Sequence, residues 1–89
     1  MTTHADVAKW MNDNLRSSKC LYQDMAAMDI ISIFGDEFTY MNENGNIAIN
    51  KKVLYLFKKL TGDSVVWERG QRMWRHRENH DEPGRLQDY

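Results

Sequence analysis

Apolar side chains recur at helical spacing in three parts of the chain, residues 4–16, 23–34 and 51–61. In a helix these positions fall on one side, away from the polar residues between them. They are Val7, Trp10, Met11 and Leu15 in the first part, Ala27, Ile30, Ile31 and Phe34 in the second, and Val53, Leu56, Phe57 and Leu60 in the third. The pattern predicts three amphipathic helices that share one core.

Capping residues mark where these helices begin and end. Thr3 and Asp6 have the spacing of a capping box at the start of the first helix, and Asn50 can cap the third. Gly35 and Gly62 directly follow the second and third helices, where a left-handed residue commonly ends a helix. These signals support the predicted boundaries.

Short runs rich in β-branched and aromatic residues lie between and after the helices. Residues 20–22 predict a brief strand or a tether. Residues 38–40 and 47–49 flank a segment rich in Asn and Gly, which predicts a small hairpin. Residues 65–67 and 72–77 flank a short turn, which predicts a C-terminal hairpin.

The register expected for the C-terminal hairpin follows from its turn, residues 68–71. If that turn is tight, Val65 opposes Trp74 and Trp67 opposes Arg72. One face of the hairpin would then carry apolar and cationic side chains together.

The composition fits one small folded domain. The chain has 89 residues, 42% hydrophobic and 28% charged, which is enough apolar material for one core but too little length for two. Apolar residues become sparse after residue 77, so we expect a compact domain over residues 1–77 and an acidic, extended or frayed tail over residues 78–89.

Cys20 is the one cysteine, which leaves no internal disulfide and fits a reducing compartment. Without an export signal or a long apolar run, we expect a cytoplasmic protein that does not cross a membrane.

The net charge of −1 is unevenly distributed along the chain. Residues 46–77 carry eight basic and two acidic side chains, whereas the segments on either side are acidic. At 100° per residue, the third helix places its cations opposite its apolar face. The candidate nucleic-acid-binding residues of this basic unit are Lys51, Lys52, Tyr55, Lys58 and Lys59 of the helix and Arg69, Arg72 and Arg75 of the hairpin. Cations of this kind can contact phosphates, and aromatic side chains can stack on bases.

Each part of this basic unit also has an ordinary structural explanation. Lysines are common on the solvated face of an amphipathic helix, and Trp67 and Trp74 can serve the core. The crowded arginines can be neutralised by the acidic tail or by the acidic helices of a second subunit. The phosphate hypothesis therefore requires helix and hairpin to form a single outward basic surface.

Motifs for catalysis or cofactor binding do not occur in the sequence: it has no Gly-rich phosphate loop, no Cys-x-x-Cys pair and no His-Glu-x-x-His segment. His76 and His80 have the i, i+4 spacing of a helical metal site, but the nearby Pro83 disfavours a helix there. Cys20 lies in an apolar run and is expected to be a buried small residue rather than a nucleophile. We therefore expect no enzymatic activity, no cofactor, no metal site and no small-molecule substrate.

The order helix, strand, helix, helix and hairpin resembles that of winged-helix domains, which have an α+β fold. In this resemblance residues 20–22 supply the first strand, the third helix enters a DNA groove, and the C-terminal hairpin is the wing. The chain departs from the pattern between its second and third helices, where about 15 residues with an extra short hairpin replace the tight turn of a helix-turn-helix. Winged-helix domains also serve as protein-interaction modules, so the resemblance alone does not fix a function.

A second resemblance covers most of the chain. Residues 38–46 (FTYMNENGN), 65–70 (VVWERG) and 81–85 (DEPGR) are similar to segments of a family of small bacterial proteins of unknown function, which implies no activity. The leading hypothesis is a winged-helix-like, non-enzymatic module that binds nucleic acid, with duplex DNA as the partner. The alternative is a protein-interaction module without nucleic-acid binding, such as a homodimer that pairs opposite charges or shares a strand edge.

Overall fold

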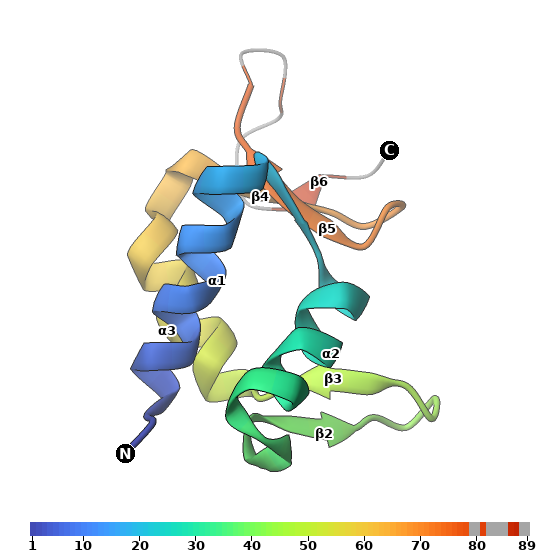
Figure 1. The fold of residues 1–89 in the computed structure, drawn as a ribbon. Coiled ribbons are helices and arrows are strands. Elements are labelled where there is room, and N and C mark those ends of the chain that lie inside the picture. Colours follow the sequence, from blue (N-terminus) through green and yellow to red (C-terminus); the bar gives the residue numbers. More distant parts are fainter. Residues whose placement is uncertain (79–80, 82–85, 88–89) are drawn as a thin grey trace.

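Figure 1 shows the fold of the computed structural model, which describes residues 1–78, 81 and 86–87. The described part contains three α-helices, two short 3₁₀ helices and six strands. In chain order they are α1 (His4–Ser18), β1 (Cys20–Tyr22), α2 (Gln23–Phe34), η1 (Asp36–Phe38), β2 (Thr39–Met41), β3 (Ile47–Ile49), α3 (Lys51–Thr61), η2 (Gly62–Ser64), β4 (Val65–Glu68), β5 (Met73–His76) and β6 (Leu86–Gln87). The predicted α+β class, with three helices and a C-terminal hairpin, is confirmed.

Hydrogen bonds confirm the predicted starts of the first and third helices. The Asp6 backbone N–H donates to the Thr3 hydroxyl over 3.2 Å, and the Thr3 N–H donates to the Asp6 carboxylate over 2.9 Å. Asn50 caps α3, because its side-chain oxygen accepts from the Lys52 N–H at 2.8 Å. Each cap satisfies an N–H group that has no partner inside its helix and contributes about 1 kcal/mol.

The end of α1 lies later than predicted. α2 and α3 have the predicted bounds, but α1 continues past Arg16 to Ser18. The chain leaves the helix at Lys19, whose φ of 71° is left-handed and whose N–H donates to the Leu15 carbonyl at 2.8 Å. Serine weakens a helix only slightly, so the polar run did not stop α1, and the left-handed backbone at Lys19 did.

The strands form two separate sheets. In the larger sheet the order is β1-β5-β4-β6, with β5 antiparallel to both β1 and β4, and β6 parallel to β4. The predicted strand at residues 20–22 is therefore an edge of this sheet. The smaller sheet is the predicted extra hairpin, β2 paired antiparallel with β3.

The register expected for the β4–β5 hairpin is wrong by two residues, because Trp67 opposes Trp74 instead of Arg72. Arg72 belongs to the turn: its φ is 52°, and its N–H donates to the carbonyl oxygen of Arg69 at 3.3 Å. The turn therefore takes four residues between β4 and β5. The predicted turn, residues 68–71, has the same length, so the register changes because the turn lies one residue later in the chain. This shift places the two tryptophans side by side on neighbouring strands.

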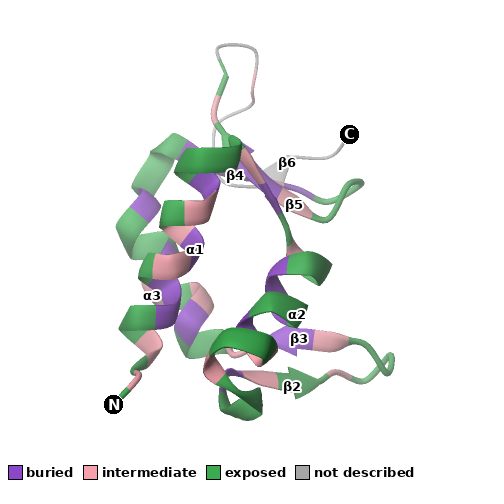
Figure 2. Ribbon diagram, viewed as in Figure 1, coloured by how far each residue is buried: buried purple, intermediate pink, exposed green. Residues whose placement is uncertain are grey.

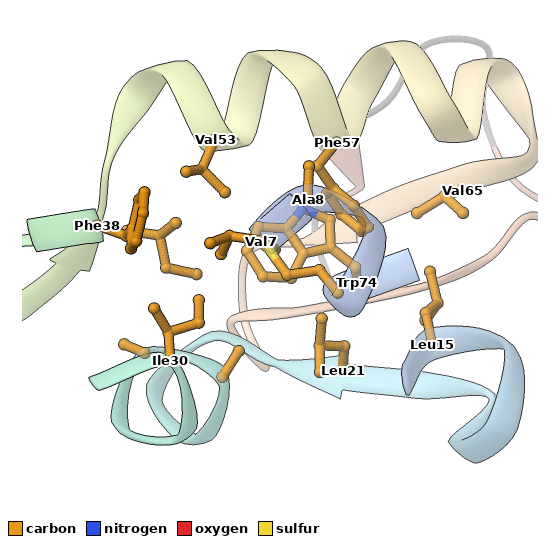
Figure 3. Packing of buried hydrophobic residues seen from close by; sticks show 14 residues of the cluster. Val7, Ala8, Leu15, Leu21, Ile30, Phe38, Val53, Phe57, Val65 and Trp74 are labelled. Carbon is orange, nitrogen blue, oxygen red and sulfur yellow. The ribbon is translucent and has the colours of Figure 1, made fainter. Parts of the chain in front are cut away.

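The hydrophobic core lies where α1 and α3 meet the inner face of the larger sheet (Figure 1). Phe57 of α3 and Trp74 of β5 contact edge to face, with ring centroids 5.3 Å apart. Figure 3 shows Val7 and Ala8 of α1 beside this aromatic pair. Rings of this size bury much apolar area, so the contact between helix and sheet stabilises the fold strongly.

The β2–β3 hairpin and η1 separate α2 from α3 along the chain. α2 packs mainly against β3 and η1, whereas α1 packs mainly against α3. Figure 2 shows buried positions on α2 where it lies over the hairpin and exposed positions on its outer side. α2 and α3 are thus not joined by the tight turn of a helix-turn-helix.

The predictions for the C-terminal tail fall largely outside the described residues, which include only Glu78, Asp81 and β6 of that segment. In this described part, β6 pairs with β4. Among the helices that the structure describes, none combines the length and the apolar character needed to cross a bilayer.

Candidate functional site

The outward face of α3 carries the five residues predicted there to contact nucleic acid, Lys51, Lys52, Tyr55, Lys58 and Lys59. All five are exposed, whereas Val53 and Phe57 on the opposite side are fully buried. In the part of the chain that the structure describes, no salt bridge involves any of the four lysines. The Lys59 ammonium lies 5.1 Å from the centroid of the Tyr55 ring, a cation–π contact within the face. We call these five residues the lysine face.

Arg75, predicted to contact nucleic acid from the C-terminal hairpin, lies in that hairpin, but its side chain is mostly buried and does not join an outward basic surface. Its side chain is only 11% exposed and lies on β5, between β1 and β4. Nε donates to the Glu68 carboxylate at 2.5 Å, and the terminal nitrogens donate to both carboxylate oxygens of Asp81 at 2.7 and 2.8 Å. The hydrogen bonds to Asp81 raise the pKa of Arg75 and outweigh burial, which lowers it, while Glu68 adds to the rise. Carboxylates of the same molecule therefore neutralise this cation.

The two turn arginines lie apart from the lysine face, because the β4–β5 turn projects away from α3 (Figure 1). Arg72 pairs instead with Asp24 at the start of α2, over 3.2 Å, with both side chains exposed. Arg69 is exposed in the same turn. Helix lysines and hairpin arginines thus do not form the single basic surface that the sequence hypothesis required.

A groove of about 480 Å³ runs beside the lysine face, between α3 and the β4–β5 hairpin. Its volume lies within the range of small-molecule sites, roughly 300–1,000 Å³. The residues that line it are Gln23, Lys51, Leu54, Tyr55, Lys58, Trp67 and Trp74. Among the described residues, its walls are mainly apolar and aromatic, and the charged side chains that line it are two lysines and no carboxylate.

The sheet wall of the groove arises from the cross-strand pair of Trp67 and Trp74. Residues directly opposite on antiparallel strands point to the same face, and here the ring centroids are 4.7 Å apart with planes inclined by 52°. Trp74 is 6% exposed and belongs to the core, which is the packing role that the sequence allowed for it. Trp67 packs against that core but is only partly buried, so its remaining surface lines the groove.

This groove could not be predicted from the sequence. A helical wheel could have placed Leu54 at the border of the lysine face, since it lies three residues after Lys51. Gln23 and Trp67 belong to other elements, and Trp67 reaches the groove through a hairpin register that was predicted wrongly.

These features define a small α+β protein that presents a cationic helix face beside an aromatic groove. Within the described residues, no three side chains of the metal-ligating types are grouped so that they could hold a metal ion.

The chain belongs to a family described as "Family of unknown function (DUF6953)", whose model matches residues 3–76, from α1 to the end of β5. The predicted membership in a family of unknown function is therefore confirmed. No curated protein and no solved structure matches the chain.

Proposed function

We propose that this protein is a non-enzymatic module that binds nucleic acid through the phosphate backbone, using the lysine face of α3. The observation that carries this proposal is the set of four exposed lysines on one short helix, none in a salt bridge within the described residues. Like charges this close repel each other, and phosphates would relieve that repulsion. Lysine–phosphate contacts position a protein on nucleic acid without reading sequence.

The arrangement of the elements supports a winged-helix-like relationship. β1 pairs with β5, so the first strand and the C-terminal hairpin belong to one sheet beside the helices. In this proposal α3 takes the place of the recognition helix and presents the lysine face to a groove of the nucleic acid. The inserted hairpin is a departure from that pattern, and Arg75 supplies no wing contact, so α3 carries the interaction.

Salt dependence tests the proposal, because each neutralised phosphate contributes about −0.9 to the slope of log K against log salt on B-DNA. Replacing Lys52 and Lys59 together by Gln should make the slope shallower by about 1.8. Fluorescence anisotropy of a labelled duplex, titrated at several salt concentrations, measures this slope.

The matched control is the double variant Lys9→Gln with Arg16→Gln. It removes the same charge from exposed positions on α1 and should leave the slope close to that of the wild type. No binding even at about 50 mM salt would overturn the proposal, and so would equal effects of the two double variants.

Self-association is a second candidate, favoured by exposed apolar side chains on α2 and β2. Met25 of α2 is 67% exposed and Met41 of β2 is 64% exposed. Within the described residues β2 pairs with β3 alone, so its other edge is open to a strand from a second copy. Light scattering over a wide concentration range tests this candidate: Met41→Lys should shift a dimer toward monomer, and a wild type that stays monomeric throughout excludes it.

A further inference from the structure

The groove beside the lysine face has an aromatic wall held firmly in place. The ring centroids of Trp67 and Trp74 are 4.7 Å apart, and the Trp74 ring packs edge to face against Phe57 in the core. The surface of Trp67 that remains accessible faces the groove opposite Tyr55 and Leu54 of α3. A planar aromatic group suits such a wall, because flat rings stack on tryptophan and leave little unfilled space.

The charged side chains of the groove indicate which group would accompany a planar aromatic ring in a ligand. Lys51 and Lys58 are separated by two helical turns, about 10 Å along the axis of α3, with Tyr55 between them. In the part of the chain that the structure describes, the charged side chains lining the groove are these two lysines, so the groove favours an anionic group. Gln23 also lines the groove and adds an amide, which can both donate and accept hydrogen bonds.

We propose that this groove binds a nucleotide, with its base against Trp67 and its phosphate at Lys51 or Lys58. The inference rests on the proposed function and narrows it to nucleic acid with unpaired bases. Inside a duplex each base is stacked and paired, so it must leave the stack before it can reach a tryptophan in a groove. A single strand offers bases and phosphates together, which is the combination that aromatic, basic grooves bind. The same chemistry is present in a free nucleotide, which is the other source.

The first experiment compares a labelled single-stranded oligonucleotide with a duplex of the same length by anisotropy, using the full chain. Stacking of one base on tryptophan should favour the single strand by about 5- to 150-fold. Trp67→Leu should remove that preference and leave duplex affinity within about twofold of the wild type. Trp67→Phe keeps a ring and should retain part of the preference.

A second measurement avoids the risk that a Trp67 variant fails to fold. Tryptophan fluorescence of the wild type is titrated with the oligonucleotide and, separately, with thymidine monophosphate. Saturable quenching that Lys51→Glu or Lys58→Glu abolishes supports the groove, and quenching that survives both changes overturns it. The control Lys9→Glu on α1 should leave the quenching unchanged. Quenching by the monophosphate identifies the free nucleotide as a sufficient ligand, whereas quenching by the strand alone identifies the polymer.

The outcomes separate the two proposals. Equal affinity for strand and duplex, with no effect of Trp67→Leu, overturns the nucleotide groove and leaves the lysine face standing. Saturable quenching by the monophosphate with no binding of either polymer overturns the lysine-face proposal and supports the groove. No binding of strand, duplex or monophosphate overturns both.

Discussion

Arg75→Met takes a cation out of a buried cluster and leaves two carboxylates behind. The side chains of Arg75 and Glu68 are each 11% exposed, and that of Asp81 is fully buried. Removing one partner of such an ion pair costs about 3–5 kcal/mol, because the remaining carboxylates stay buried without the opposite charge that balanced them. At about 0.05–0.15 kcal/mol per residue, the whole chain of 89 residues has a stability of about 4–13 kcal/mol. We therefore expect this one substitution to remove about a quarter or more of the free energy of unfolding.

A double variant separates the effect of charge from that of shape. Adding Glu68→Met to Arg75→Met removes one of the two carboxylates that lose their contact with the guanidinium group. The double variant should therefore be more stable than Arg75→Met alone by at least about 1 kcal/mol. Arg69→Met is the matched control, because Arg69 is exposed in the turn and its loss should change stability by no more than about 0.5 kcal/mol.

Urea unfolding followed by tryptophan fluorescence measures these differences, since Trp67 and Trp74 lie on the strands that carry Glu68 and Arg75. The slopes against urea must agree between variants for the midpoints to be compared. The pKa of Arg75 is raised by the fold, so its charge stabilises the protein at every pH below the unfolded value, and the cost should be constant around neutrality. A loss below about 1 kcal/mol, or a double variant no more stable than the single one, would refute the reasoning.

Two backbone substitutions should act in opposite directions in the same unfolding assay. Lys19→Gly should stabilise the protein by about 1 kcal/mol, because Lys19 holds a left-handed φ of 71° that costs a residue with a Cβ. Gly62→Ala should destabilise by about 1–3 kcal/mol, because φ 55° and ψ −135° are adopted almost only by glycine. The cost is conformational, since apart from its chain neighbours no atom of the described residues lies within 4 Å of the added Cβ. A gain of stability for Gly62→Ala, or a loss for Lys19→Gly, would contradict the backbone argument.

The helices were predictable because their signals are local. Asn50 and Gly62 bound α3 within the sequence itself, and the capping box of Thr3 and Asp6 starts α1 as its spacing predicts. The end of α1 was missed because Lys19 has no sequence feature that favours a left-handed backbone. The position of the β4–β5 turn was predicted wrongly for a related reason. The sequence suggests Gly70 as the residue with a positive φ, but Arg72 adopts it, and the strand register differs from the prediction by two residues.

The candidate binding residues also divide into those placed by local sequence and those placed by distant contacts. The lysine face depends only on the 100° step of a helix, so its five residues could be placed together from the sequence. The position of Arg75 depends on which partner strands and which carboxylates reach it, and Asp81 comes from a segment beyond the hairpin. Since Arg69, Arg72 and Arg75 of the hairpin do not join the lysine face, the proposed phosphate contacts fall to α3 and the adjoining groove. Substitutions on α3 should therefore weaken nucleic-acid binding far more than substitutions in the β4–β5 turn.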